Sequence, residues 1–410
     1  MGRWVLVLLL AVTSCAPVGR PPAASIDHSP LRTQATLRLG DKELQDGRFV
    51  GLALSGGGSR AAVFAAAVMK ELDRLAILQQ VDVLSAVSGG ALPAAAYALD
   101  GYRGLDFRNG FVEQLGQDLQ QDIIGPWYAA PANLLRYRLT RTIPSARVVR
   151  VLDDRIFHGA TFADLNPSKP RLLLNSTDAL SGEPFVISDE RLAELHQPLA
   201  PWSVALAVYM SAAYPGVMEP VALYDGRPEA HGSDRPAAVV YDGGPSDNLG
   251  VRTLMGVLDR ALEQRPMPEL FPRGCLVISV DATGRHTSGD GELLSASAVL
   301  LKSHRREVLE LAGIPAAQQD SASFGGFPVG RNGLSGVCRF WHIALRRLAE
   351  SDPLGARVTH IKTNLGLSVE DQAALALAAA RLVGEGRAEA ERRPDMARFL
   401  ESSPSVQSTP

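Results

Sequence analysis

The sequence predicts an α/β fold with a mostly parallel central sheet, and three observations lead to this prediction. Two short apolar runs, 49–55 and 81–87, are each bounded in the way that buried strands are. Each run is followed by a glycine-containing turn and then by a segment of good helix formers, 61–72 and 91–99. The chain has 410 residues, of which 46% are hydrophobic and 21% are charged, so it can bury a large core in one or two domains.

The turn after the first predicted strand contains three consecutive glycines, Gly56, Gly57 and Gly58, followed by Ser59 and Arg60. Glycine has no Cβ, so the chain can turn sharply here and several N–H groups can point at one place. A helix begins at the same point, and the N-terminus of a helix attracts negative charge. We therefore predict that this loop binds an anion.

The second predicted strand ends at Ser88, which precedes Gly89 and Gly90. A serine at a tight strand-to-helix turn between small residues is typical of a nucleophile elbow, so Ser88 is the candidate nucleophile. The carboxyl ends of parallel strands lie at one edge of a sheet, and we expect Ser88 and the glycine loop to meet there. Acyl transfer requires this arrangement.

A third motif, Asp242-Gly243-Gly244, ends the predicted strand 237–241. Asp-Gly pairs also form ordinary turns, so the motif taken alone leaves the role of Asp242 open between a turn former and a catalytic base. Asp247 and Asn248 follow and are expected to open and cap a helix over 249–262.

The three motifs together resemble those of the patatin-like phospholipases in type, order and spacing, over roughly residues 48–384. The resemblance implies a three-layer α/β/α sandwich with a mostly parallel central sheet. It also implies a serine acyl hydrolase that cleaves carboxylic ester bonds of membrane lipids through an acyl-enzyme, with no cofactor. Its substrate would be a phospholipid or another acyl ester.

The resemblance also assigns roles to individual residues. Ser88 would be the nucleophile in an elbow that includes Gly90, and Asp242 would be the base, without a histidine. The oxyanion hole would comprise Gly56, Gly57, Gly58 and Arg60, with Arg60 expected to brace the loop rather than touch the oxyanion. One residue departs from the family pattern: Ala86 replaces the first glycine of Gly-x-Ser-x-Gly, and alanine disfavours a positive φ.

Three alternatives to this mechanism remain open. A Ser-His-Asp triad would need one of the histidines that follow Asp242, which are His286, His304, His342 and His360. None of them lies in a distinctive motif. The same acyl-enzyme could instead transfer its acyl group to an alcohol, as a transacylase does. A catalytically inert lipoprotein that binds lipid is the third alternative.

The N-terminus resembles a bacterial lipoprotein signal. A minimal positive start and a short apolar stretch precede Cys15, which would be lipidated, and the non-acidic Ala16 goes with the outer membrane. An ordinary secretory signal with a nearby cysteine is the alternative. We expect a signal over 1–15, a tether over 16–47 and an enzyme anchored by lipid in the cell envelope. The anchor would hold the enzyme close to its substrate lipids.

The remaining cysteines, Cys275 and Cys338, both begin predicted strands, 275–280 and 339–348. One disulfide is possible, but two buried free thiols are favoured, and no metal-ligand spacing is present. The net charge of -3 and the lack of a basic run between aromatics give no sign of nucleic-acid binding.

Other segments yield coarser predictions. An aromatic segment that includes Trp127 and Tyr128 either packs over the core or forms a lid or acyl-binding insertion. Paired strands are expected at 171–177 and 184–188, a buried helix at 202–213, a helix at 292–312 and a mobile glycine-rich loop at 321–336. In the buried helix, Ser211 is expected to be structural. A helix over 368–383 completes the hydrolase domain, and 385–410 is expected to be a helix end and a disordered tail.

Overall fold

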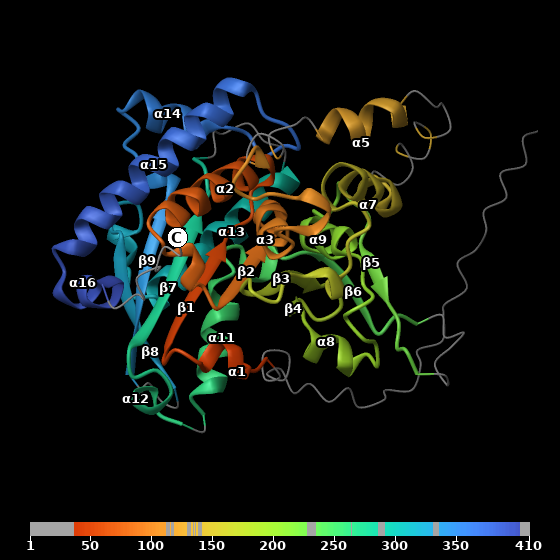
Figure 1. Ribbon diagram of the computed structural model, residues 1–410. Helices are drawn as coiled ribbons and strands as arrows, with labels where there is room; N and C mark the ends of the chain where they lie inside the picture. The colour runs from red at the N-terminus through yellow and green to blue at the C-terminus, as the bar shows by residue number, and fades with distance from the viewer. Residues whose placement is uncertain are drawn as a thin grey trace, which may run out of the picture.

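A computed structural model describes residues 37–401, apart from 112–114, 116–118, 129–132, 134, 136, 138–141, 228–234, 264, 286–291 and 331–335 (Figure 1). The described residues form one nine-stranded sheet, and eight of its strands lie in the order β5-β6-β3-β2-β1-β7-β9-β8, while β4 pairs with β3. The strands are β1 (Arg48–Leu54), β2 (Val83–Val87), β3 (Arg171–Asp178), β4 (Pro184–Ile187), β5 (Val221–Leu223), β6 (Ala238–Asp242), β7 (Gly274–Asp281), β8 (Phe324–Val329) and β9 (Gly336–Ala344).

The centre of the sheet is parallel and its margins are antiparallel. Strand β1 pairs in parallel with β2 and β7, β2 with β3, and β7 with β9. Strands β4 and β6 pair with β3, β5 with β6, and β8 with β9 in the antiparallel sense. The predicted α/β class with a mostly parallel central sheet is therefore confirmed.

Helices cover both faces of the sheet, because side chains alternate along each strand. In β1, Leu52 and Leu54 belong to one apolar cluster with α2 and α15, whereas Phe49 and Ala53 belong to a second cluster with α11. Helices α2 and α15 lie against each other (Figure 1). These two clusters are the interfaces between the three layers of the sandwich.

The helices of the first cluster are mostly those next to the strand ends that carry the motifs. They are α2 (Gly58–Arg74), α3 (Ala91–Ala98), α5 (Leu119–Tyr128), α7 (Ser145–Leu152), α8 (Asp189–Glu194), α9 (Val204–Ala212), α14 (Pro353–His360), α15 (Val369–Glu391) and α16 (Pro394–Glu401). The others are α1 (Asp41–Leu44), α10 (Gly244–Asp247), α11 (Val251–Ala261), α12 (Met267–Leu270) and α13 (Glu292–Leu311). None of these helices is long and apolar enough to cross a bilayer, as far as the described residues go.

The folded domain extends past both predicted boundaries. Leu37 is only 1% exposed and packs in the second cluster, so the part of the predicted tether from residue 37 to 47 is attached to the domain. At the other end, α16 buries Met396 and Phe399 in the first cluster. At both ends, apolar side chains that pack on the core extend the domain beyond the boundaries that composition suggested. Cys15 and the signal lie outside the described residues.

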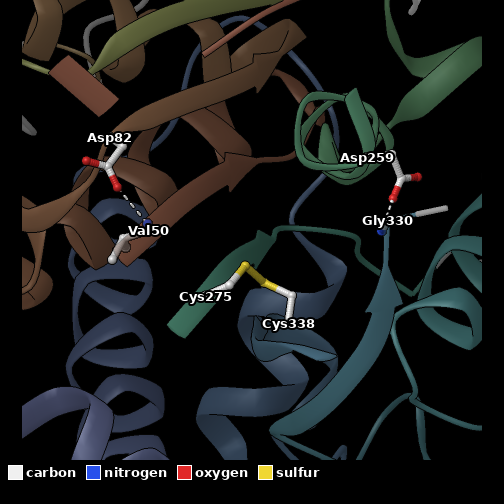
Figure 2. The surroundings of a disulfide bond; sticks show 6 residues. All are labelled: Val50, Asp82, Asp259, Cys275, Gly330 and Cys338. Carbon is white, nitrogen blue, oxygen red and sulfur yellow. Dashed lines mark hydrogen bonds between the residues drawn. A yellow bond between two sulfur atoms is a disulfide. The ribbon is translucent and has the colours of Figure 1, made fainter. Parts of the chain in front are cut away.

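The favoured prediction of two free thiols is wrong, because Cys275 and Cys338 form a disulfide (Figure 2). In the parallel register of β7 and β9, Leu276 lies opposite Arg339, so the two cysteines that precede them are neighbours. Their Cα atoms are 4.8 Å apart, within the range of a disulfide. The prediction that each cysteine begins a strand holds nearly to the residue, but it did not include the adjacency of the strands.

The predicted mobile loop at 321–336 is also wrong over residues 324–329. Residues Phe324–Val329 form β8, which pairs with β9 at the edge of the sheet. Phe324, Phe327 and Val329 are buried, and this apolar spacing outweighs the weak strand preference of Gly325 and Gly326. Of the aromatic segment near Trp127, the structure describes α5 and single residues such as Leu135, which is 60% exposed.

Candidate active site

Ser88 and Asp242 meet because the strands that carry them end beside the same part of β3. Val87, the last residue of β2, pairs with Asn175, and Asp242, the last residue of β6, pairs with Ser176. Strand β2 runs parallel to β3 and β6 runs antiparallel to it, so their carboxyl ends approach each other. Two residues that are far apart in the sequence are therefore brought together by the order of the strands.

Ser88 occupies a strained backbone conformation. Its φ is 52°, in the left-handed region that residues other than glycine rarely adopt. The Ser88 N–H donates to the hydroxyl of Ser211 at 2.9 Å, and the Ser211 hydroxyl donates to the carbonyl oxygen of Asn175 at 2.6 Å. Buried Ser211 therefore connects the elbow to β3, and this contact helps to hold the strained turn.

Asp242 is nearly enclosed, with 4% of its surface exposed. Its Oδ1 accepts the N–H of Gly244 at 2.7 Å, and the Ser88 side chain lies close enough to its carboxyl group to act on its pKa through hydrogen bonding. Burial raises the pKa of Asp242 to about 6, against the opposing effect of these two hydrogen bonds. The carboxylate is thus ionised at neutral pH yet much more basic than an ordinary aspartate.

The glycine loop lies directly against Ser88. A Cβ on Gly56 would lie 3.2 Å from the Cβ of Ser88, and a Cβ on Gly89 would overlap the carbonyl oxygen of Gly58. Gly57 and Gly58 have φ values of 139° and 61°, which glycine alone adopts readily. Among the described residues, no acceptor contacts their N–H groups. These two amides are the donors that the loop offers.

Two residues of the predicted oxyanion hole have other partners. The N–H of Gly56 donates to the carbonyl oxygen of Asn248 at 3.0 Å, so Gly56 shapes the loop and does not offer this donor to an oxyanion. Arg60 is 5% exposed, and its guanidinium donates to the carbonyl oxygens of Ala282, at 2.8 Å, and of Ile361. Burial lowers the pKa of Arg60 to about 10, with Asp281 opposing this effect. Arg60 therefore connects the start of α2 to the segments that follow β7 and α14.

The small residues of the elbow fit for different reasons. A Cβ on Gly90 would lie 2.7 Å from the carbonyl oxygen of Ser55, so only glycine fits between the elbow and the end of β1. Ala86 lies inside β2 and is not among the residues with positive φ. Alanine is therefore tolerated in place of the family glycine, because the strain falls on Ser88.

Sequence reasoning missed a buried polar network beneath the elbow. The Asn175 amide donates to the hydroxyl of Ser85 and to the carbonyl oxygen of Ala86, both at 2.9 Å, and it accepts from the Thr253 hydroxyl at 2.6 Å. The buried carboxylate of Asp247 accepts the N–H groups of Gly250 and Thr253. The available signal was Asn175, a polar residue directly after the apolar run 172–174 of a predicted buried strand, since buried polar groups need partners.

Asn248 is a further residue at the site that the sequence analysis did not assign to it. Its side-chain Oδ1 lies 2.6 Å from the place where a Gly56 Cβ would be and 3.2 Å from the corresponding place on Gly244. The amide therefore lies between the glycine loop and the turn that follows Asp242. The signal would have been its position six residues after Asp242, at the start of the next helical segment.

His342 and His360 have partners away from Asp242, whereas the buried Nδ1 of His304, on α13, has no hydrogen-bond partner among the described residues. His342 is fully buried, 3.5 Å from the carboxylate of Asp281, and His360 contacts the carbonyl oxygen of Ala356 and the side chain of Glu350. The groups that hydrogen-bond to Asp242 are Ser88 and Gly244. His286 lies outside the described residues. This arrangement favours a dyad over a triad.

Comparison with known families gives one match. Residues 52–255 match a family described as patatin-like phospholipase. These residues of the chain belong to the patatin-like phospholipase family. The matched range contains the glycine loop, Ser88 and Asp242, and membership supports a lipid ester hydrolase. No curated protein matches the sequence.

Solved structures with a related fold include human GIVD cytosolic phospholipase A2, with 11% identity and a TM-score of 0.50 over 88% of this chain and 61% of that chain. VipD from Legionella pneumophila matches with 13% identity and a TM-score of 0.39 over 87% of this chain and 67% of that chain. At such identities the likeness to the human enzyme concerns the fold alone. This chain spans about three fifths of the length of that enzyme.

Proposed function

We propose that this protein is a serine acyl hydrolase that cleaves carboxylic ester bonds of membrane lipids with a Ser88–Asp242 dyad. The observation that carries the proposal is the juxtaposition of Ser88, at a strained elbow beside two glycine amides, with the buried carboxylate of Asp242, whose pKa the Ser88 side chain lowers. A nucleophile, a base and oxyanion donors are the groups that ester hydrolysis by serine requires.

The proposed reaction has two halves. Asp242 takes the proton of the Ser88 hydroxyl as its oxygen attacks the ester carbonyl, and the N–H groups of Gly57 and Gly58 stabilise the negative oxygen that forms. The alcohol leaves with the proton from Asp242, and an acyl-enzyme remains on Ser88. Water then attacks the acyl carbon while Asp242 again takes the proton, and the fatty acid leaves as Ser88 is regenerated.

Labelling with a fluorophosphonate probe tests this proposal. The full chain, purified in detergent micelles, should be labelled on Ser88 and should release fatty acid from phospholipids, lysophospholipids or short-chain esters. Ser88→Ala should abolish both signals. Silence of the wild-type protein in both assays would favour the inert lipoprotein, and acyl transfer to added glycerol in place of fatty-acid release would favour the transacylase.

We also propose that the enzyme is anchored by a lipid on Cys15 at the cell envelope, with the outer membrane as its location. The Cys275–Cys338 disulfide supports export, because disulfides persist mainly in oxidising compartments. Incorporation of labelled palmitate that Cys15→Ser abolishes would support the anchor. Retention of the label in this variant would contradict it.

A further inference from the structure

A pocket of about 310 Å³ lies next to the glycine loop, outside the groups that the proposed reaction uses. Residues of the segment between α14 and α15, with the adjoining ends of these helices, line it: Arg357, His360, Ile361, Lys362, Asn364, Gly366, Leu367, Ser368 and Asp371. Its volume is at the lower end of the range of small-ligand sites, about 300 Å³ and above.

Two sets of contacts fix this segment against the start of α2. The carbonyl oxygen of Asn364 accepts the N–H of Ser59 at 2.9 Å and the Ser59 hydroxyl at 3.1 Å. The same oxygen lies 2.5 Å from the place where a Gly58 Cβ would be. Arg60 donates to the carbonyl oxygen of Ile361, one residue before Lys362. The pocket wall is thus continuous with the loop that supplies the oxyanion donors.

The pocket carries a positive charge that is not neutralised locally. Arg357 pairs with Asp371 at 2.9 Å, whereas Lys362 is exposed and has no ion pair within the part of the chain that the structure describes. Arg60 cannot serve a ligand here, because it is buried and its guanidinium is bound to two carbonyl oxygens. Lys362 is therefore the cation of this pocket that is left for a ligand.

We propose that this pocket binds the phosphate group of a phospholipid substrate, with Lys362 as its main contact. This inference rests on the proposed function. In a phospholipid the phosphate is joined to the glycerol that carries the acyl esters, so an ester carbonyl at Gly57 and Gly58 places the headgroup close to the loop. A lysine ammonium is a point charge well suited to a phosphate. The site would make the enzyme prefer phospholipids to neutral glycerides.

The test compares phosphatidylglycerol with a diacylglycerol of the same acyl chains, in the same mixed micelles. Lys362→Ala should lower kcat/KM about fivefold for phosphatidylglycerol, mainly through KM, and should leave diacylglycerol hydrolysis within about twofold of wild type. Lys362→Arg should restore most of the loss. Equal changes on both substrates, or none on phosphatidylglycerol, would overturn the inference.

Arg392→Ala provides a matched control. Arg392 is exposed, like Lys362, and it follows the other end of α15, which is about 35 Å long at 1.5 Å per residue. The change removes the same charge from the surface, so a general effect on binding to charged micelles should appear in both variants. A loss in Arg392→Ala equal to that in Lys362→Ala would contradict a local site.

A second measurement separates a lipid headgroup from free phosphate. Inorganic phosphate should inhibit hydrolysis of a neutral short-chain ester more strongly in wild type than in Lys362→Ala if the pocket takes the free ion. Absence of inhibition in both, with the phospholipid effect present, would assign the pocket to the lipid-linked group. Equal inhibition in both would place phosphate elsewhere and count against the pocket.

The failures of the two proposals look different. Wild-type protein that is not labelled at Ser88 and is inert on both lipids would contradict the proposed function itself. Wild-type protein that hydrolyses both lipids through Ser88, with Lys362→Ala unchanged on phosphatidylglycerol, would leave the dyad standing and remove only the phosphate pocket. Thermal unfolding of each variant checks that the exposed substitutions leave the fold intact.

Discussion

Asp242 and Asp281 occupy equivalent places in the fold but have opposite properties. Each is the last residue of a strand, β6 or β7, and each is almost wholly buried. Burial raises the pKa of Asp242 to about 6, because its partners are a hydroxyl and one N–H group. Burial would raise the pKa of Asp281 too, but the Arg305 guanidinium at 2.6 Å outweighs it and holds the pKa well below its usual range.

The difference shows that the neighbour, rather than burial or position, decides what a carboxylate at this edge of the sheet can do. Asp281 is fixed as an anion, and with Arg305 it ties α13 to the end of β7. The nearby His342 is held neutral, since burial lowers its pKa to about 4. Among the residues that the structure describes, no cation pairs with Asp242, which retains the affinity for a proton that a general base needs.

The largest expected effect is the loss of turnover when the dyad is broken. Asp242→Asn and Ser88→Ala should each lower kcat/KM by about 10³-fold or more, because the base or the nucleophile is removed while the oxyanion donors remain. Asp242→Asn should unfold at the same temperature as wild type or higher at pH 7, since burial opposes the charge of Asp242. Near wild-type turnover in Asp242→Asn would refute the dyad and favour a mechanism in which a histidine is the base.

The corresponding change at Asp281 should affect stability instead. Asp281→Asn leaves the Arg305 guanidinium buried without its anionic partner, and we expect a loss of about 3–5 kcal/mol in the free energy of unfolding. Denaturant titration measures it. Glu385→Gln is the control, since it breaks an exposed pair with Arg381 and should cost less than about 0.5 kcal/mol. Equal losses in the two variants would mean that the buried pair has no special role.

The contributions of Asp242 and Asp281 to stability should change with pH in opposite directions. Below the Asp242 pKa of about 6 the base is protonated, so kcat/KM should fall about tenfold per pH unit. In the folded state Asp242 binds a proton more tightly than the unfolded carboxyl, whose pKa is about 3.9, so its contribution to stability falls as pH rises between these values. Asp281 has the opposite sign: its contribution is present above its unfolded pKa and is lost as pH falls toward its lowered folded pKa.

Burial also raises the pKa of Asp247 to about 6, so Asp247 contributes to the pH dependence of stability as well. Because Asp247 remains in both proteins, comparison of wild type with Asp242→Asn isolates the contribution of Asp242. Stability of the variant relative to wild type should increase from pH 4 to pH 6. A kcat/KM profile with no inflection near pH 6 would argue against Asp242 as the base.

The parts of the fold that the sequence predicts are those set by local pattern. The run 49–55 and the following helix formers specify a strand and a helix within a few residues of β1 and α2, because burial and helix propensity act over short stretches. The elbow at Ser88 is predicted for the same reason, since the glycines around it mark a tight turn. The order of three such motifs identifies the family.

The parts that could not be predicted depend on which strands are neighbours. The Cys275–Cys338 bond follows from the adjacency of β7 and β9, which α13 and β8 separate in the chain. The use of the Gly56 N–H by Asn248 and of Arg60 by Ile361 likewise depends on segments that are distant in sequence. Local sequence specifies which groups a loop carries, but packing decides which of them remain free for a substrate.

Loss of the support of the elbow should have a smaller effect than loss of the dyad itself. Ser211→Ala removes the acceptor of the Ser88 N–H and the donor to Asn175. Because Ser88 is held at a φ of 52°, loss of this contact should let the turn relax and misplace the hydroxyl relative to Asp242. We expect kcat to fall about tenfold with little change in KM, in line with about 1–2 kcal/mol for a buried hydrogen bond.

Ser211→Thr, which keeps a hydroxyl at this position, is the conservative variant and should recover most of the activity. The rate of fluorophosphonate labelling at Ser88 should fall in parallel with kcat in Ser211→Ala, because both depend on the orientation of the nucleophile. A variant that loses stability but labels and turns over like wild type would show that Ser211 only fills the core. Parallel losses of labelling and kcat in a fully folded variant would establish it as the residue that positions Ser88.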